Sequence, residues 1–203
     1  INGIGVILNI KQEELGDFEK QQQIKRPQFT VHPQHKRPDH FPITYIEPLD
    51  ANVQAVGLDV AYEDNRYQAV LNARDTGLAQ VTGPITLVQD SEQTPGFLFY
   101  APYYKGGHYP GNETRREQFL GMVYAPFVVS KLMQGTLQQD RRSVGIQIKD
   151  SDVVLYNEHN ENSVEYDPNP LFAEISEIAL YGRIWQFDIR TTLAFKRKDR
   201  KST

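Results

Sequence analysis

The residues whose types and spacing suggest chemistry are three histidines and two aspartates. His32, His35 and His40 lie within nine residues, and Asp39 directly precedes the last of them. Three imidazoles and a carboxylate are a possible ligand set for zinc. Two prolines break this segment, however, and no helix or strand is predicted to fix the ring directions. We therefore predict a solvated surface loop and no metal site. A hydrolase that uses these histidines is the alternative, and it would need an organised network of partners.

Asp59 is the second candidate, because it lies among apolar and small residues at the end of a short helical turn. A carboxylate in apolar surroundings is costly unless it is paired, so a hydrogen-bond donor of a ligand is a natural partner. The alternative is structural: Asp59 caps a helix or pairs with Arg66 or Arg74. Aromatic and β-branched residues nearby either belong to the core or line the same pocket. The residues predicted to line it with Asp59 are Thr76, Val81, Thr82, Thr86, Phe99 and Tyr103.

The elements that must position these side chains follow from local patterns. Residues 41–46 are β-branched and aromatic and favour a strand. Residues 65–75 have helical spacing, and Gly77 is expected to end that helix because glycine tolerates the left-handed conformation. Strands are predicted at 80–88 and 97–103, joined by a turn at 94–96 that makes them an antiparallel pair.

The remaining segments alternate between extended and helical patterns. Strands are predicted at 1–10, 28–31, 119–127, 143–148, 153–156 and twice within 176–195; helices are predicted at 11–23, 50–56 and 128–139. Most strand pairings can be antiparallel, which indicates an α+β fold. Residues 106–116 are rich in glycine and charge, and we predict that they connect two lobes, 1–105 and 106–203.

Composition excludes several protein classes. The chain has 203 residues, enough for one large domain or two small lobes, and its net charge of 22 − 26 = −4 gives no indication of a nucleic-acid partner. It has no cysteine, which excludes disulfides and thiolate metal sites. No apolar run approaches the ~20 residues that span a membrane. Because the chain starts at Ile1 rather than Met, we expect it to be a soluble piece of a longer protein.

Several motifs resemble those of the CHASE domain, a sensory module of bacterial and plant membrane receptors. In order they are FPITYIEPL at 41–49, GLD at 57–59, ARDTG at 73–77, TGPITLV at 82–88 and APYY at 101–104. Residues 1–10 and 119–128 are similar to its flanking segments, and the similarity fades beyond about Gly135. The resemblance implies a stalk helix, largely missing from this chain, followed by two PAS-like α/β lobes. The membrane-distal lobe, 1–105, would bind the ligand through Asp59, and the proximal lobe would be 106–203.

The expected function is therefore small-molecule sensing on the periplasmic or extracellular face of a membrane. The sensor itself would be non-catalytic and without cofactor, and would form a homodimer in the full receptor. Its attachment to the membrane would be through flanking helices outside this chain. The output would be a cytoplasmic diguanylate cyclase, phosphodiesterase or histidine kinase. A scaffold that binds a protein partner without a small ligand is a third possibility.

Overall fold

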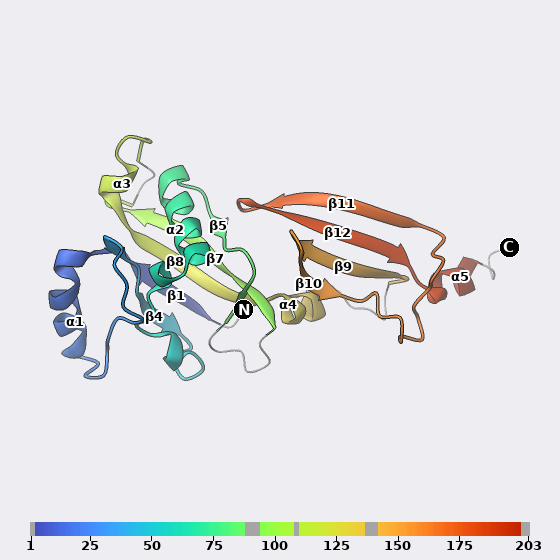
Figure 1. The fold of residues 1–203 in the computed structure, drawn as a ribbon, viewed down its shortest axis with the longest axis horizontal. Coiled ribbons are helices and arrows are strands. Elements are labelled where there is room, and N and C mark those ends of the chain that lie inside the picture. The colour runs from blue at the N-terminus through green and yellow to red at the C-terminus, as the bar shows by residue number, and fades with distance from the viewer. Residues whose placement is uncertain (1–2, 88–93, 108–109, 137–141, 200–203) are drawn as a thin grey trace.

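The computed structural model describes residues 3–87, 94–107, 110–136 and 142–199, which form two larger antiparallel sheets and a third of only two strands, with helices beside them (Figure 1). This arrangement confirms the α+β class. In Figure 1 the first sheet and α2 lie at one end of the molecule, the second sheet and the C-terminus lie at the other, and α4 lies between them.

Within the described residues the first sheet has six strands, in the order β4-β1-β8-β7-β5, with β6 paired to β7. Its longest pairing joins β7 to β8 from Gly96 and Val128 at one end to Tyr104 and Phe119 at the other. The strands are β1 (Ile4–Leu8), β4 (Ile43–Glu47), β5 (Gln80–Val81), β6 (Ile85–Thr86), β7 (Pro95–Tyr104) and β8 (Phe119–Val128).

Helix α2 (Asp64–Thr76) covers one face of this sheet because it has a stripe of small and branched residues. Ala69, Val70 and Ala73 are buried against the sheet. Gly77 ends the helix with φ 73°, as predicted, because this left-handed conformation carries no steric penalty for glycine. The other helices and helical turns are η1 (Gln12–Glu14), α1 (Leu15–Gln23), η2 (Val53–Ala55), η3 (Val60–Tyr62), α3 (Arg115–Gln118), α4 (Val129–Thr136) and α5 (Leu193–Asp199).

The second sheet has four strands in the order β10-β9-β12-β11, all antiparallel. Its side chains alternate as the sequence predicts: Trp185 and Phe187 of β12 belong to the core, while Ile184 on the opposite face is exposed. The strands are β9 (Val144–Asp150), β10 (Val153–Asn157), β11 (Ala173–Leu180) and β12 (Arg183–Thr191).

Strand β7 contributes to two hydrophobic cores, because alternate side chains of a strand point to opposite faces. Leu98 and Tyr100 pack in the core beneath α2. Phe97 and Phe99 pack in the core of the second sheet, where the Phe97 ring lies 5.3 Å from that of Trp185. The two sheets are therefore joined through side chains of β7, together with Val81 of β5 and Phe127 of β8.

Two predictions about the elements were wrong. Residues 28–31 are not a strand, since Phe29 and Val31 are buried beside α1 without forming a ladder. The described part of the predicted strand at 80–88, residues 80–87, contains two short strands, β5 and β6, and residue 88 lies outside the described residues. The segment 106–116 leads from β7 to β8, which are neighbours in one sheet, so the predicted lobe boundary at 105/106 does not separate the sheets. The PAS-like nature of two lobes stays a prediction.

Candidate functional site

Asp59 carries a fully buried carboxylate whose two oxygens are both engaged. Its side chain is 0% exposed. Oδ1 accepts backbone N–H groups of Phe41 at 2.8 Å and Ala61 at 2.9 Å, and the second of these caps η3. The backbone holds Asp59 in place, because its N–H donates to the carbonyl of His32 at 2.7 Å. A short acidic side chain is suited to this capping role.

His35 and His40 both direct a ring nitrogen at Oδ2 of Asp59. The distances are 2.8 Å from His35 Nε2 and 2.7 Å from His40 Nδ1. The two rings stack with centroids 4.4 Å apart and planes 21° apart. Their side chains are only 7% and 3% exposed, so the prediction of a solvated loop was wrong for these two histidines. Only His32 of the three is exposed.

The other ring nitrogens determine where the protons lie. His35 Nδ1 accepts the N–H of Arg37 at 3.1 Å, so the proton of a neutral His35 lies on Nε2 and is donated to Asp59. His40 Nε2 lies 2.9 Å from Oε1 of Gln12 and donates to it when the amide oxygen faces the ring. A neutral His40 in this arrangement presents an unprotonated Nδ1 to the Asp59 carboxylate.

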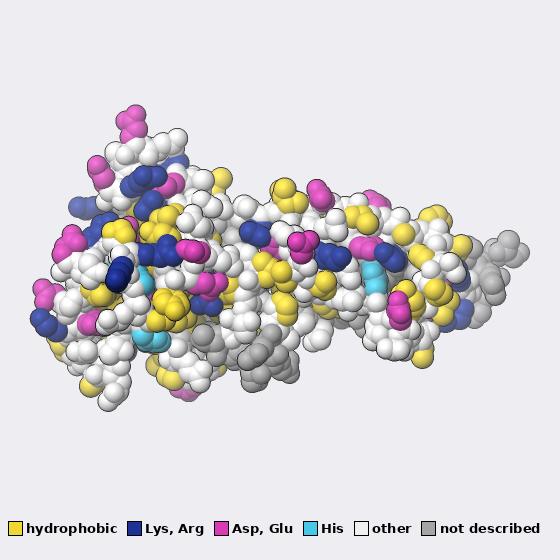
Figure 2. Space-filling view, in the orientation of Figure 1, with side chains coloured by type: hydrophobic (Ala, Val, Ile, Leu, Met, Phe, Trp, Pro, Cys, Tyr) yellow, Lys and Arg dark blue, Asp and Glu magenta, His cyan; other side chains and the backbone are white. Residues whose placement is uncertain are grey.

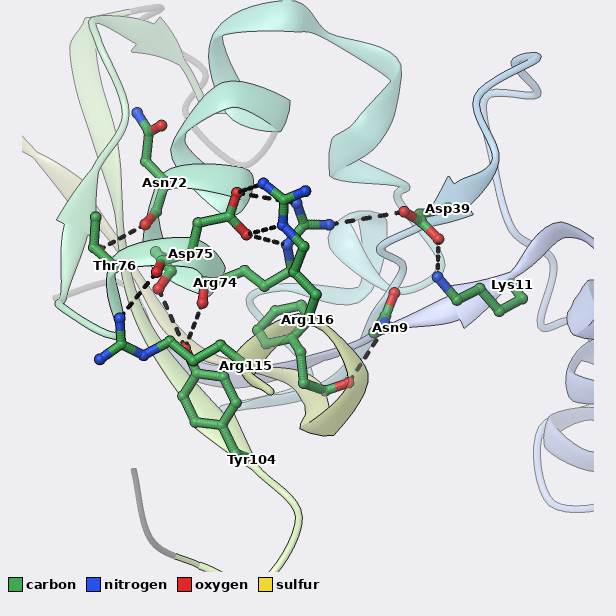
Figure 3. A network of polar contacts seen from close by, with 12 residues as sticks. Asn9, Lys11, Asp39, Asn72, Arg74, Asp75, Thr76, Tyr104, Arg115 and Arg116 are labelled. Carbon is green, nitrogen blue, oxygen red and sulfur yellow. Dashed lines mark hydrogen bonds and ion pairs between the residues drawn. The ribbon is translucent and has the colours of Figure 1, made fainter. Parts of the chain in front are cut away.

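Strand β3 (Asp39–His40), which pairs with β2 (Ile10–Lys11), fixes the position of His40. Asp39 is held from two sides: Lys11 Nζ lies 2.5 Å from its Oδ1, and a guanidinium nitrogen of Arg74 lies 3.9 Å from its Oδ2 (Figure 3). Since Arg74 belongs to α2, the histidine segment is tied to the helix that covers the first sheet.

The same network continues to α3 through Asp75 (Figure 3). Burial raises the pKa of Asp75, but ion pairs with Arg74 and Arg116 outweigh this and lower the pKa below its usual value. Arg115 donates to the carbonyl of Asp75 at 3.0 Å, and Tyr104 donates to the carbonyl of Arg74 at 2.7 Å. Arg74 thus has the structural pairing that its place at a helix end favours.

A cavity of about 120 Å³ lies directly beside the two stacked rings. It has polar walls from the histidines and two glutamines, and apolar walls from α1 and the chain before the histidines. The lining residues are Gln12, Leu15, Val31, Pro33, Gln34, His35 and His40.

The family model of the CHASE domain matches residues 1–165, which include the Asp59 cluster and the cavity beside it. The chain belongs to the CHASE domain family. CHASE is an extracellular, non-catalytic sensory domain of signalling receptors. A search of the curated proteins gave no match. Among the described residues, no helix combines the length and the apolar character that a membrane span requires.

The cavity beside the Asp59 cluster is not lined by any of the six other residues predicted for the ligand site. Thr76 and Thr86 are exposed, at the end of α2 and in β6. Thr82 is buried, and its hydroxyl accepts the N–H of Leu98 at 3.0 Å. The other three lie on the paired strands β5 and β7 and are buried or half-buried. Val81 of β5 and Phe99 of β7 are opposite each other in the pairing and both pack in the second core. Tyr103 lies further along β7, and burial raises its pKa.

A second, larger cavity of about 500 Å³ lies at the end of the second sheet, and sequence reasoning did not single it out. Arg142 and Glu158, which form an ion pair, both line it. Arg190 lines it too and pairs with Asp188, whose pKa the Arg190 guanidinium lowers. Among the described residues, Nε2 of His159 is buried there without a hydrogen bond. The signal that was missed is the polar loop at 157–169, which folds over the strand ends.

Proposed function

We propose that this chain is the small-molecule sensing module of a membrane receptor, on the periplasmic or extracellular side. The observation that carries the proposal is the buried cluster of Asp59, His35 and His40 beside a cavity in the part that matches the family. A buried ionisable cluster is costly to fold and is therefore a candidate for function rather than for stability alone.

The contacts of the cluster connect a ligand in the cavity with the helix that covers the first sheet. Asp59 caps η3, and η3 leads directly into α2, which covers the first sheet. A ligand that enters the cavity and displaces either imidazole therefore changes the partners of Asp59 and the start of α2. Binding that favours one of two arrangements of this segment shifts their populations.

The wider parts of the proposal concern what lies outside this chain. Helices that flank the domain would attach it to the membrane, and two copies would form a homodimer in the full receptor. A cytoplasmic diguanylate cyclase, phosphodiesterase or histidine kinase would read the change. The first unit, residues 1–105 with the strands that complete its sheet, would bind the ligand, and the remainder would relay the change toward the membrane.

The second cavity is a second candidate location for the ligand, favoured by its size. Its volume of about 500 Å³ falls within the roughly 300–1,000 Å³ typical of metabolite sites, whereas about 120 Å³ suits only a very small ligand or part of a larger one. Basic and acidic side chains are interspersed over the face shown in Figure 2. The charged pairs of this cavity would suit a polar ligand.

Mass spectrometry of molecules released from the purified protein, together with thermal-shift screening of metabolites, tests the proposal. Gln34→Trp and Asn160→Trp form a matched pair, because each adds bulk at an exposed residue that lines one cavity. We expect Gln34→Trp to abolish the ligand-induced rise in Tm and Asn160→Trp to preserve it. The reverse result places the ligand in the second cavity. If no released molecule and no metabolite is found to bind, the proposal is wrong.

A further inference from the structure

The contact between His40 and Asp59 has room for a shared proton or a metal ion. With the amide oxygen of Gln12 toward the ring, His40 donates Nε2–H to Gln12, which leaves a lone pair on Nδ1 in the neutral ring. That lone pair lies 2.7 Å from a carboxylate oxygen, which is also an acceptor. Two acceptors do not approach so closely with nothing between them, and a metal ion fits this position. With the amide turned over, Nδ1–H of the neutral ring donates to Asp59 instead.

We propose that the cluster binds a divalent transition-metal ion of the zinc type, with His35 Nε2, His40 Nδ1 and Asp59 Oδ2 as ligands. These three atoms lie within 4.8 Å of one another, and all three side chains are almost fully buried. Protons on His35 Nε2 and His40 Nδ1 satisfy both contacts, since a carboxylate oxygen accepts two hydrogen bonds, and a metal ion that replaced these protons would use the same three converging atoms. Two imidazoles and one carboxylate favour zinc and its neighbours over magnesium or calcium.

The surroundings have the outer contacts that metal ligands need. Gln12 accepts from the far nitrogen of His40 and so keeps Nδ1 free for a metal. Asp59 Oδ1 stays bound to the N–H groups of Phe41 and Ala61, which leaves Oδ2 as a single ligand atom. Ligand atoms of a tetrahedral zinc lie roughly 3.3 Å apart, by the usual bond lengths. The 2.7 and 2.8 Å contacts to Oδ2 must therefore open by about half an ångström.

Metal binding has one further requirement at His35. Its proton must move from Nε2 to Nδ1, where it displaces the N–H of Arg37 that Nδ1 now accepts. Arg37 also pairs with Asp64, the first residue of α2, and its guanidinium lies 4.1 Å from the ring centre of Tyr67. Occupancy of the site is therefore communicated to α2 through Arg37.

Three protein ligands leave a fourth position, and the 120 Å³ cavity offers room for it. Water or a donor atom of a small molecule can occupy that position. This inference rests on the proposed sensing function and narrows the ligand class: the sensed molecule carries a metal-binding group such as a carboxylate, or the metal ion itself is the signal.

The test titrates the 203-residue chain with Zn²⁺ by calorimetry after dialysis against EDTA, and with Co²⁺ by visible absorption. We expect one equivalent to bind, a tetrahedral Co²⁺ spectrum, and the proton of His35 on Nδ1 by ¹⁵N NMR. His35→Ala and His40→Ala should each weaken binding more than about 100-fold, beyond the 10–100-fold that loss of an outer contact costs. Gln12→Leu should lie within that range, and Gln12→Glu, which keeps an acceptor, should bind as the wild type does.

His32→Ala is the matched control, because His32 is exposed in the same segment and outside the cluster. It should bind Zn²⁺ unchanged. If the folded wild type binds no stoichiometric Zn²⁺, or if binding survives both alanine variants, the metal inference is overturned. Because the wild-type titration and NMR suffice for this outcome, a variant that fails to fold does not obscure it. A metabolite that binds the metal-free chain and is blocked by Gln34→Trp would support sensing while contradicting the metal.

Discussion

His35 and His40 stack face to face, 4.4 Å between ring centres, and point at one carboxylate oxygen of Asp59. The histidine segment and the buried aspartate, which lie in different parts of the sequence, thus form a single cluster. The histidines are partners of Asp59, and the cavity lies on their other side. A ligand in that cavity would reach Asp59 through the imidazoles rather than directly.

Replacement of the buried histidines should destabilise the fold. His40→Ala removes one partner from Asp59 and one from Gln12, so we expect the free energy of unfolding to fall by about 2–3 kcal/mol. His32→Ala should change it by less than about 0.5 kcal/mol, since His32 is exposed. Urea denaturation in EDTA at pH 7 measures both. Equal small effects would show that His40 is not anchored as described.

Asp59→Asn should also destabilise, because the amide cannot accept all four hydrogen bonds. One end of an asparagine side chain is an NH₂ donor, which would face either the two imidazoles or the two backbone N–H groups. We expect a loss of about 1.5–3 kcal/mol, the range for hydrogen bonds to a charged group. Thermal and urea unfolding measure it, with Asp152→Asn in an exposed turn as the control. An unchanged Asp59→Asn variant would contradict the buried carboxylate.

Gly57 should tolerate no side chain. Its φ of 83° is left-handed, and an added Cβ would lie 2.0 Å from the carbonyl oxygen of Thr30. Gly57→Ala should therefore cost about 2 kcal/mol or more, the left-handed penalty plus the clash. Gly111→Ala is the control, because its Cβ would meet nothing within 4 Å. Chemical denaturation compares the two, and similar stabilities would argue against this path of the chain into Asp59.

The pair of Asp188 and Arg190 should make stability depend on pH. The pKa of Asp188 is lowered in the folded state, first by hydrogen bonds from Arg190. A lowered pKa stabilises the fold above the unfolded value of about 3.9, and this contribution disappears as pH falls through the folded pKa. The stability difference between wild type and Asp188→Asn should therefore be full at pH 6–7 and shrink below about pH 4. Urea midpoints measured from pH 7 to 3 test this, and a difference that grows on acidification would contradict the pairing.

Much of the fold was predictable, because long periodic segments determine local structure. The α2 segment, its end at Gly77, strand β8 and the β9–β10 hairpin follow from spacing and turn residues. The strand predicted at 28–31 failed because burial of Phe29 and Val31 against α1 gives the same apolar signal as a ladder. The long connection at 106–116 suggested a boundary between lobes, yet adjacent strands of one sheet accept long connections as readily as short ones.

The site was predictable only in its parts. Asp59 stood out as a carboxylate among apolar residues, and the histidines stood out by their density. Their meeting depends on backbone bonds between segments distant in sequence, such as that from the N–H of His32 to the carbonyl of Gly57, which no local pattern encodes. The prolines near the histidines suggested that nothing fixes the orientation of the imidazole rings. In the structure, strand β3 and the ion pairs of Asp39 fix it.

The sharing of β7 between two cores has a consequence for how the chain unfolds. Phe97 and Phe99 leave the second core whenever β7 leaves the first sheet, so the first sheet cannot melt while the second core stays intact. The two sheets should behave as one cooperative unit, with a single calorimetric transition whose van't Hoff and calorimetric enthalpies agree. A perturbation beside Asp59 would then change the free energy of unfolding of the whole domain, including the β-sheet near the C-terminus.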